Sequence, residues 1–525
     1  MNAAISWVCA RRWRQALLLV LVSAAIFLPR LGATGLSMSE GHRAIPAWEM
    51  LEDARAGEAH WLVPRMFETA YLRKPPGMLW AIAGSTAVFG ETEFAARFPS
   101  ALSAMLLGLA VWWFATRWFG SPWGLAAGLA QVLLPVTWPS ARSAEIESLH
   151  MLTTGVACLA ITDALTRNPI TLRFALSTHA LLVLGIVGTV LTKGPAGAPF
   201  IVATFLMCWR SGERRGRFPP LQFALIVTAA TVAALRLFAE WDTTIAQSAG
   251  RVVLQGVSDF MWEPSRLIAI FLLGLVVIAT MLPASLALMF PFGPDCNAER
   301  QQELIRWGPL ARHAETDIAR CLAWSGVVSL LLLTVFGVGN PRYGLPLCAL
   351  LTPLIAYVAR GMGRRGLKGP APAFVGKRPA IAQAMFLGRP WVWPVVLLIG
   401  AAVYVGVLEP DRRASSGRDA GIALAAALPD GAELWADEMV EARPEVLYYA
   451  VREAARQGRD VRVRWLKPSF LPAEQPGGLL LLLREDELVD EVSQYGGMPR
   501  FGSLEEIARG EVHKYTFVLV RAGLR

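Results

Sequence analysis

The chain is poor in the residues that build disulfide or zinc–cysteine scaffolds, and poor in charged side chains. It has six cysteines in 525 residues, and no two of them have the spacing of zinc ligands. All six lie in apolar stretches or in loops that we assign to the cytoplasm, so we expect neither disulfides nor a zinc–cysteine site. Charged residues make up 17% of the chain and hydrophobic residues 54%. A soluble core cannot bury that much apolar surface, which predicts a membrane protein.

An internal repeat and a long low-complexity tract are also missing, apart from a Gly/Pro/basic linker at about 361–379. The net charge of +9 does not indicate a nucleic-acid partner. The basic residues sit in short loops between apolar runs and not on one aromatic-rich surface, so membrane topology explains them better.

Long apolar stretches recur from residue 16 to residue 408, and the mean hydropathy is +0.43. A spanning helix needs about 20 mostly apolar residues. The first stretch, Ala16 to Leu28, follows a basic segment, and the spans after it favour an uncleaved anchor over a signal peptide. The other candidates lie at about 98–116, 122–138, 144–165, 174–191, 194–209, 221–240, 265–290, 319–336, 343–358 and 391–408. The sequence predicts a polytopic α-helical membrane protein with about eleven spans, and up to thirteen.

Lys and Arg mark the loops that stay in the cytoplasm. They place the N-terminus inside, with further cytoplasmic loops around Arg214 and Arg364. The segments 35–97, 139–147 and 241–263, the turn near 340 and everything beyond 409 then lie outside. The apolar run Pro76 to Phe89 has about 14 residues, too few for a span. We therefore read 35–97 as one large external loop that contains short helices.

The composition changes at Glu409 to mixed charged and apolar residues. Strand-like runs at Val461 to Leu466, Gly478 to Leu483 and Tyr515 to Arg521 alternate with helical stretches such as Pro444 to Gln457. We expect residues 1–408 to form the transmembrane domain and residues 409–525 a small extracytoplasmic α/β domain.

Carboxylates occur at two places on the predicted external face. Glu40 follows the first span, where a solvated loop acid is the alternative reading. Glu145 and Glu147, with His150, stand where a later span enters the membrane. Ionisable groups are costly at such a place unless they face a cavity, which favours a functional site.

Cations gather on the same predicted face, at Arg73 and Lys74 before a Pro-Pro pair, at Lys193 and at Arg342. Each one alone is explained equally well by a side chain that snorkels to the membrane surface. Together with the acids they are the side chains that a phosphate-linked, membrane-held substrate requires.

Four motifs in order then resemble a known family. They are Lys74-Pro75-Pro76 after a tyrosine, Ala96-Arg97-Phe98-Pro99-Ser100-Ala101-Leu102, Leu191-Thr192-Lys193-Gly194-Pro195, and Arg342-Tyr343 with Pro346. Over residues 10 to 360 the chain resembles the bacterial branch of the protein-mannosyltransferase and aminoarabinose-transferase superfamily. The resemblance implies a GT-C fold, a glycosyltransferase of the bacterial inner membrane and a polyprenyl-phosphate sugar donor.

The resemblance also implies roles for single residues. Glu40 matches one acid of the family's Asp-Glu pair, which reads Ser39-Glu40 here, and Glu147 matches the acid at the head of the fourth span, with Glu145 as a nearby substitute. The basic positions near the lipid phosphate are matched by Lys74, Lys193 and Arg342, with Arg73 and Tyr343 beside them. In aminoarabinose transferases an acid linked to a metal site commonly precedes Lys-Pro-Pro, where this chain has Arg73. This difference weakens the prediction of a divalent metal cofactor, which stays an open alternative, and the assignment to that particular activity.

We expect a single displacement with inversion. Glu40 would take the proton of a lipid, glycan or protein acceptor, Glu147 would orient that acceptor, and the cations would stabilise the leaving phosphate. A transporter or lipid flippase is the main alternative, and a non-catalytic scaffold for the C-terminal domain is a third. Carriers usually place ionisable groups near the bilayer midplane and show repeats, whereas here these groups cluster at span ends.

Overall fold

The computed structural model describes residues 11–166, 172–211, 310–335, 341–365, 399–408, 417–436, 443–465, 479–485, 501–512 and 515–524, apart from 59, 68, 72 and 73, together with residues 227, 229 and 232. The predicted spans at 221–240 and 265–290 lie outside the described residues, except for those three positions, and Arg73 lies outside them too. The chain forms two compact units. The helical unit contains 1–29, 100–142 and 146–403, and the mixed unit contains 30–99, 143–145 and 404–525.

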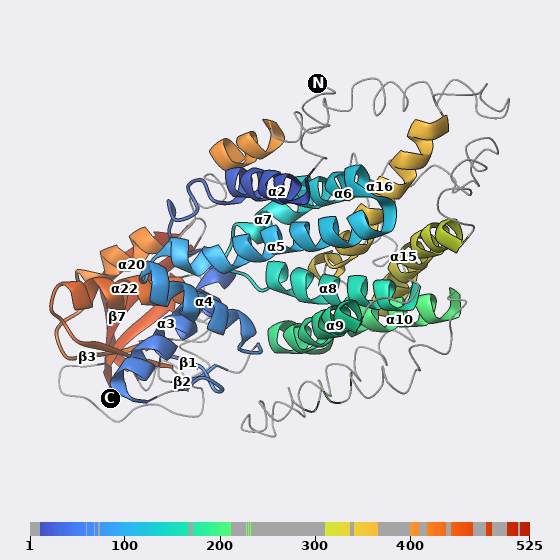
Figure 1. Cartoon of the computed structure of the whole chain (residues 1–525). Coiled ribbons are helices and arrows are strands. Elements are labelled where there is room, and N and C mark those ends of the chain that lie inside the picture. The colour runs from blue at the N-terminus through green and yellow to red at the C-terminus, as the bar shows by residue number, and fades with distance from the viewer. Residues whose placement is uncertain are drawn as a thin grey trace. The chain divides into compact units, whose positions relative to one another are not determined.

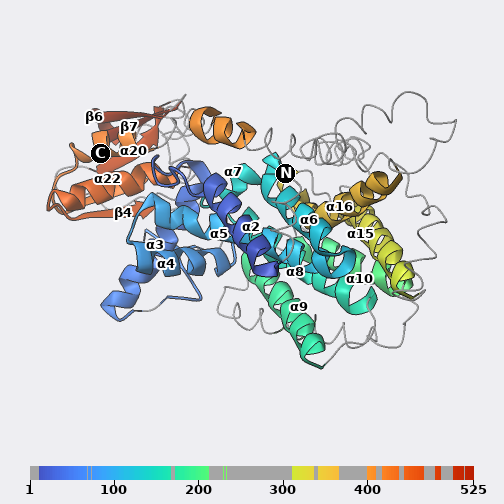
Figure 2. The ribbon, with the colours of Figure 1, turned by 45° about the horizontal axis from the view of Figure 1, so that its top comes forward.

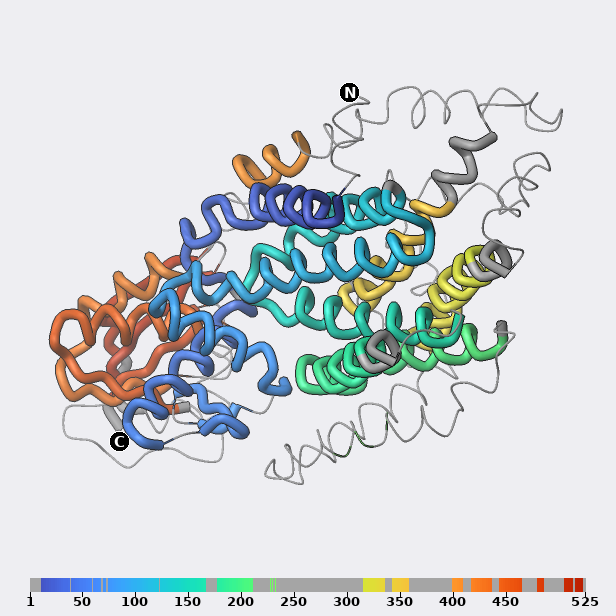
Figure 3. Tube along the Cα trace, viewed as in Figure 1, coloured from blue at the N-terminus to red at the C-terminus, as the bar shows by residue number. Residues whose placement is uncertain are grey.

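Helices fill the helical unit (Figure 1). They are α2 (Arg12–Phe27), α5 (Glu93–Phe119, whose first residues belong to the mixed unit), α6 (Ser121–Leu133), α7 (Trp138–Ala141), α8 (Glu147–Thr166), α9 (Leu172–Lys193), α10 (Ala198–Ser211), α15 (Leu310–Val335) and α16 (Leu347–Arg365), with 3₁₀ turns η2 (Pro135–Thr137), η3 (Gly194–Gly197) and η5 (Pro341–Gly344). Helix α8 packs against α9, α10 and α16, and α10 packs against α15 (Figure 3).

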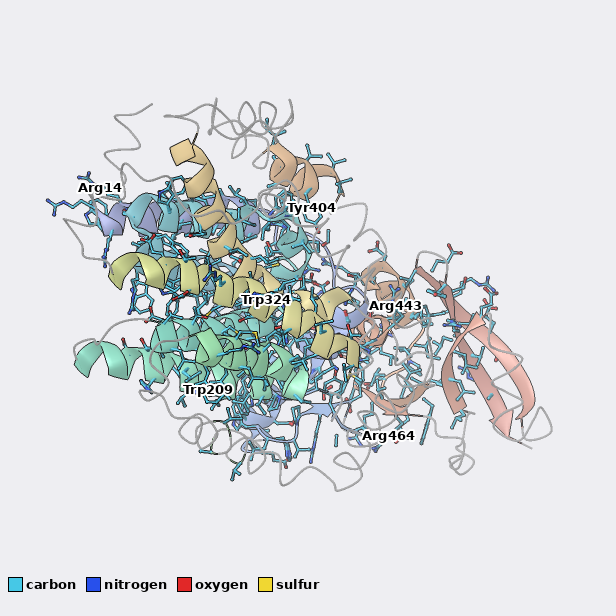
Figure 4. All side chains as sticks on the ribbon, turned by 90° about the vertical axis from the view of Figure 1, so that its right-hand side faces the viewer. Arg14, Trp209, Trp324, Tyr404, Arg443 and Arg464 are labelled. Atoms are coloured by element: carbon cyan, nitrogen blue, oxygen red, sulfur yellow. The ribbon has the colours of Figure 1, made fainter. Side chains whose placement is uncertain are left out.

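Four helical stretches in the described part are long and apolar enough to cross a membrane. They are Glu93–Phe119, Glu147–Thr166, Ser177–Arg210 with the η3 turn inside it, and Glu315–Val335. Helix α15 carries apolar side chains that are exposed in the protein alone, such as Trp324 at 58% (Figure 4). Lipid can cover such side chains. The structure therefore shows a membrane fold, while the total of about eleven spans stays a prediction.

Glycines bring α8 and α9 into close contact. A Cβ atom added at Gly185 would lie 2.8 Å from the backbone oxygen of Thr153 and 2.8 Å from the backbone nitrogen of Ala157. Small residues let membrane helices approach in this way, so that their backbones pack directly.

We expect Gly185→Val to destabilise the helical unit, because the backbone of α8 must move to admit the new side chain. Overpacking of this kind typically costs about 1–3 kcal/mol. The thermal unfolding temperature of the detergent-purified protein measures the effect. Gly84→Val is the control, since a Cβ atom there meets nothing within 4 Å. Equal melting of the two variants would contradict the tight contact.

The mixed unit combines residues from both ends of the chain (Figure 2). Its N-terminal part has η1 (Met38–Glu40), α3 (Gly41–Ala56), the short strands β1 (Arg65–Met66) and β2 (Thr69–Ala70), and α4 (Gly77–Phe89). The C-terminal part has η6 (Tyr404–Leu408), α20 (Arg418–Ala425), β3 (Ala432–Ala436), α22 (Pro444–Arg456), β4 (Val461–Trp465), β5 (Leu479–Arg484), β6 (Phe501–Val512) and β7 (Tyr515–Leu524). Helix α4 lies where a short non-spanning helix was predicted, and its 13 residues reach about 20 Å, less than a hydrocarbon core of about 30 Å.

A five-stranded sheet with the order β4-β3-β5-β7-β6 organises the C-terminal part. Strand β3 is parallel to β4 and β5, and β7 is antiparallel to β5 and β6. Strands β4, β5 and β7 and helix α22 cover the ranges that the alternating sequence pattern predicted. The buried strand β5 consists of five consecutive leucines followed by Arg484, as expected for a strand covered on both faces.

Helix α22 is hydrogen-bonded to the start of segment 35–97. The Tyr449 hydroxyl accepts a hydrogen bond from the Leu36 backbone N–H (2.6 Å) and donates one to Glu93 Oε1 (3.0 Å). Burial, and then the nearby Glu93 carboxylate, raise the pKa of Tyr449, so the phenol keeps its proton. The Leu36 amide lies one residue before the segment Ser37–Glu40, and its position therefore depends on α22.

We expect Tyr449→Phe to destabilise the mixed unit by about 1–3 kcal/mol, because the buried Leu36 N–H loses its partner. Limited proteolysis with cleavage mapped to residues 30–45 measures the effect. Tyr515→Phe in the same unit is the comparison, because Tyr515 lies on β7, away from this loop. A Tyr449→Phe protein as resistant as Tyr515→Phe would contradict the proposed link.

Candidate functional site

The three predicted acids and Lys193 fall into two groups. The acidic cluster, in the mixed unit, consists of Ser39, Glu40, Arg97 and Glu145. The lysine cluster, in the helical unit, consists of Glu147, His150, Lys193 and Tyr343. Each is described by itself.

Glu40 is the buried centre of the acidic cluster, with 2% of its surface exposed. Arg97 holds it with two parallel hydrogen bonds, from Nε to Oε1 and from Nη2 to Oε2, both 2.8 Å long. The Ser37 backbone N–H donates to Oε2 and the Ala144 backbone N–H to Oε1, each at 3.0 Å. The bond from Ser37 forms part of a capping box, because Glu40 ends the first turn that follows Ser37.

Arg97 is fully buried and hydrogen-bonds both to Glu40 and to the backbone of residues 31–35. Besides the carboxylate, its guanidinium donates to three backbone carbonyls, those of Leu31, Thr34 and Gly35, at 2.8–2.9 Å. The bidentate geometry and the five donors of arginine suit this role, which lysine cannot fill. The motif around Arg97 was quoted for the resemblance, but its link to Glu40 was not foreseen.

Glu145 joins the cluster through Ser39. The Ser39 hydroxyl donates to Glu145 Oε1 at 2.7 Å, and the Glu145 backbone N–H bonds to the Ser143 carbonyl in a tight turn. Unlike Glu40, Glu145 is only half-buried. The structure thus brings two of the three predicted carboxylates, Glu40 and Glu145, together near the start of segment 35–97.

Lys193 and Glu147 form the centre of the lysine cluster, where Lys193 Nζ lies 3.3 Å from Glu147 Oε1. Both side chains are largely buried. Glu147 stands in the first turn of α8 and Lys193 in the last turn of α9, so each charge has the sign that its helix end favours. Gly194 ends α9 because its φ of +62° lies in the left-handed region, and Pro195 then begins η3.

Tyr343 covers the lysine, with the ammonium nitrogen 4.1 Å from the ring centroid, a cation–π distance. Arg342, which precedes Tyr343 in the sequence, is exposed on η5. The structure therefore brings Glu147, Lys193 and Tyr343 together, with Arg342 beside them in the chain.

His150 also belongs to this cluster, although the prediction of site residues omitted it. It lies one turn after Glu147 on α8 and is 1% exposed. Its Nδ1 lies 3.4 Å from the Thr154 hydroxyl, and its buried Nε2 has no hydrogen-bond partner among the residues that the structure describes. The spacing i, i+3 from Glu147 was the signal that could have found it.

A second fully buried arginine, Arg142, was likewise not foreseen. Its guanidinium donates to the carbonyls of Ile26, Phe27 and Pro29 at the end of α2. It satisfies carbonyls that a helix end leaves without intrahelical partners. Arg142, which directly precedes the acidic segment 143–147, thus links that part of the chain to the C-terminal end of α2.

Lys74 is half-buried in the turn before α4, in the mixed unit. Nearby, Arg43 Nη1 bonds to the hydroxyl of the buried Tyr71, the tyrosine that precedes the Lys74-Pro75-Pro76 motif. Arg73 lies outside the described residues. Within the part of the chain that the structure describes, no three His, Cys, Asp or Glu side chains gather as metal ligands would, so we derive no step through a metal.

Known proteins resemble this chain in sequence and in fold. The family model for dolichyl-phosphate-mannose-protein mannosyltransferase matches residues 73–239. An undecaprenyl phosphate-α-4-amino-4-deoxy-L-arabinose arabinosyl transferase of Pseudomonas fluorescens is 33% identical over 113 residues, which is 22% of this chain and 20% of that protein. The corresponding enzyme of Aeromonas salmonicida is 29% identical over 178 residues, 33% of this chain and 32% of that protein. The matched segments thus span a fifth to a third of these relatives.

Solved structures match over nearly the whole chain. The ArnT structure from Cupriavidus metallidurans bound to undecaprenyl phosphate aligns with a TM-score of 0.66 and 17% identity, covering 96% of this chain and 97% of that one. Its apo form aligns with a TM-score of 0.63. At this identity the likeness shows the fold. The predicted resemblance is thereby confirmed: this chain has a GT-C membrane fold and is similar in sequence to members of the protein-mannosyltransferase and aminoarabinose-transferase superfamily.

Proposed function

We propose that the protein is a glycosyltransferase that moves a sugar from a polyprenyl-phosphate carrier to an acceptor on the extracytoplasmic face of the membrane. The observation that carries the proposal is the buried Lys193 at the end of an apolar helix. It is held between Glu147 and Tyr343 where α9 ends and η3 leads to α10. An ammonium group held in this way can pair with the phosphate of a polyprenyl-phosphate donor.

The cations supply what the leaving group needs. The phosphate departs as an anion, so fixed positive charges near its oxygens lower the barrier. We assign this role to Lys193, Lys74 and Arg342, with Tyr343 as a neutral donor and Arg73 as a sequence prediction. An arriving phosphate would compete with Glu147 for the Lys193 ammonium.

The carboxylates supply what the acceptor needs, since a hydroxyl must lose its proton as the new glycosidic bond forms. Glu40, Glu145 and Glu147 are the candidates. Only Ile146 separates Glu145 from Glu147 in the sequence. Consecutive Cα atoms are about 3.8 Å apart, so the covalent chain itself limits how far the two acidic residues can separate.

The remaining features of the proposal follow from the sequence. They are inversion by single displacement, a cytoplasmic N-terminus, an inner-membrane location and an external α/β domain at 409–525. The names of the relatives suggest undecaprenyl phosphate carrying 4-amino-4-deoxy-L-arabinose as donor, and the family name suggests polyprenyl-phosphate mannose. The acceptor class is a lipid, a glycan or a protein.

The test uses the full chain in proteoliposomes with each of these two donors, together with a lipid, glycan and protein extract of the source cells. We expect release of free polyprenyl phosphate and a covalently labelled acceptor from one donor. Movement of labelled donor between leaflets without any covalent product would instead identify a flippase and contradict the proposal.

A further inference from the structure

We propose that Glu145, held by Ser39, is the general base that takes the proton of the acceptor, and that Glu40 is a positioning residue. This inference rests on the proposed function and adds the division of labour between the two carboxylates of the acidic cluster.

Glu40 is poorly placed to accept a proton. Five donors reach its two oxygens at 2.8–3.2 Å, two from Arg97, two from backbone N–H groups and one from the Ser37 hydroxyl. A carboxylate has about four lone-pair sites, and these contacts use that capacity. With 2% of the residue exposed, Glu40 is also less accessible to an acceptor than the half-buried Glu145.

Glu145 is better placed. It is half-buried, and the hydrogen bond from the Ser39 hydroxyl to Oε1 fixes the orientation of its carboxylate. Serine is a poor base near neutral pH, but its hydroxyl can orient and stabilise a carboxylate. Ser39 therefore acts through Glu145 as a second positioning residue.

The bonds around Glu40 explain how it acts at a distance. The Ala144 backbone N–H, one residue before Glu145, donates to Glu40 Oε1. Glu40 thus binds the peptide segment that carries Glu145, while Arg97 fixes Glu40 to the carbonyls of residues 31, 34 and 35. The buried carboxylate of Glu40 thus helps to position the half-buried carboxylate of Glu145.

The proposed step balances as follows. The acceptor O–H gives its proton to Glu145, and the acceptor oxygen forms a bond to the anomeric carbon of the sugar. The bond from that carbon to the phosphate oxygen breaks, and its electron pair leaves with the phosphate, which gains one negative charge. Glu145 afterwards releases the proton to water.

The experiment measures release of polyprenyl phosphate by full-length variants in proteoliposomes, at several pH values, with the donor that the wild type uses. For Glu145→Gln we expect kcat to fall about 100-fold or more, as for loss of a general base, with the donor KM within about twofold of wild type. The decline of the wild-type rate at acidic pH should vanish from the residual activity. Glu58 is an exposed acid of the same mixed unit, so Glu58→Gln is the control and should match wild type.

Ser39→Ala and Glu40→Gln separate positioning from simple structural damage. We expect Ser39→Ala to keep the acidic decline but to move it to higher pH, because the carboxylate loses a donor that favours its charged form. Glu40→Gln should lower kcat while it keeps that decline.

Glu145→Gln with a rate within about threefold of wild type, or with the same acidic decline in its residual rate, would overturn the inference. Loss of the decline in Glu40→Gln instead would make Glu40 the base. A wild type that releases no polyprenyl phosphate from either donor would contradict the proposed function itself, which distinguishes the two failures.

Discussion

Arg97→Leu is expected to destabilise the mixed unit by about 3–5 kcal/mol and to abolish transfer, the largest effect on stability of any substitution considered. Arg97 is fully buried, and its loss leaves the Glu40 carboxylate without a counter-charge. The carbonyls of Leu31, Thr34 and Gly35 lose the same donor. Thermal unfolding of the purified protein, with proteolysis at residues 30–45, measures the result.

A double substitution sharpens this prediction. Replacing both members of a buried ion pair by apolar residues costs much less than removing one, because no unpaired charge stays buried. Arg97→Leu/Glu40→Leu should therefore melt at a higher temperature than Arg97→Leu alone. Arg55→Leu, an exposed arginine on α3, is the matched control. If Arg97→Leu melted like Arg55→Leu, the central position of Arg97 in the cluster would be wrong.

Lys193→Met is expected to lower kcat by about 100- to 1,000-fold, the usual effect of removing one donor that stabilises a developing anion. Its methylene chain is replaced by one of similar shape, so packing against Tyr343 is largely kept. Lys193→Arg keeps the charge and should retain more activity than Lys193→Met. The measurement is the rate of polyprenyl phosphate release at saturating donor.

Glu147 complicates the Lys193 result, because Lys193→Met leaves a buried carboxylate without its partner. Lys193→Met/Glu147→Gln removes that carboxylate's charge and is compared with Glu147→Gln alone, because Glu147 is itself a candidate to act on the acceptor. A purely structural role of Lys193 predicts equal activity of these two variants. The proposed phosphate role predicts that the double variant is less active than Glu147→Gln, although it melts at a higher temperature than Lys193→Met. Arg320→Met, an exposed arginine on α15, controls for the loss of a cation.

The sequence predicted the parts of the fold that depend on local patterns. Apolar runs of helical length located α2, α5, α6, α8, α9, α10, α15 and α16 to within several residues, because hydrophobicity decides the position of a membrane helix. The turn after Lys193 was also foreseen from its glycine and proline. The strands of the C-terminal part were predicted because their patterns are also local: β4 alternates apolar and charged residues, and β5 is a short apolar run.

Contacts between distant residues were predicted only in part. The sequence placed Lys193, Glu147 and Tyr343 on one predicted face of the membrane, and in the structure Lys193 contacts both of the others. It gave no sign that Arg97, 57 residues after Glu40, forms a bidentate pair with it. The pairing of Ser39 with Glu145, 106 residues apart, was equally hidden. An arginine near the end of an apolar helix is costly without a partner, and that cost was the available signal for Arg97.

The central proposal, made from the sequence, is that the predicted acids and cations act on one sugar phosphate. A donor analogue with a photoreactive diazirine on its sugar, cross-linked to the full-length protein in proteoliposomes and mapped to single residues by mass spectrometry, tests it directly. We expect cross-links to residues within 35–45 or 143–145 together with cross-links to Lys193 or Tyr343, and we expect excess unmodified donor to suppress both. Cross-links that are confined to one cluster, or that persist under competition, would contradict a shared active site.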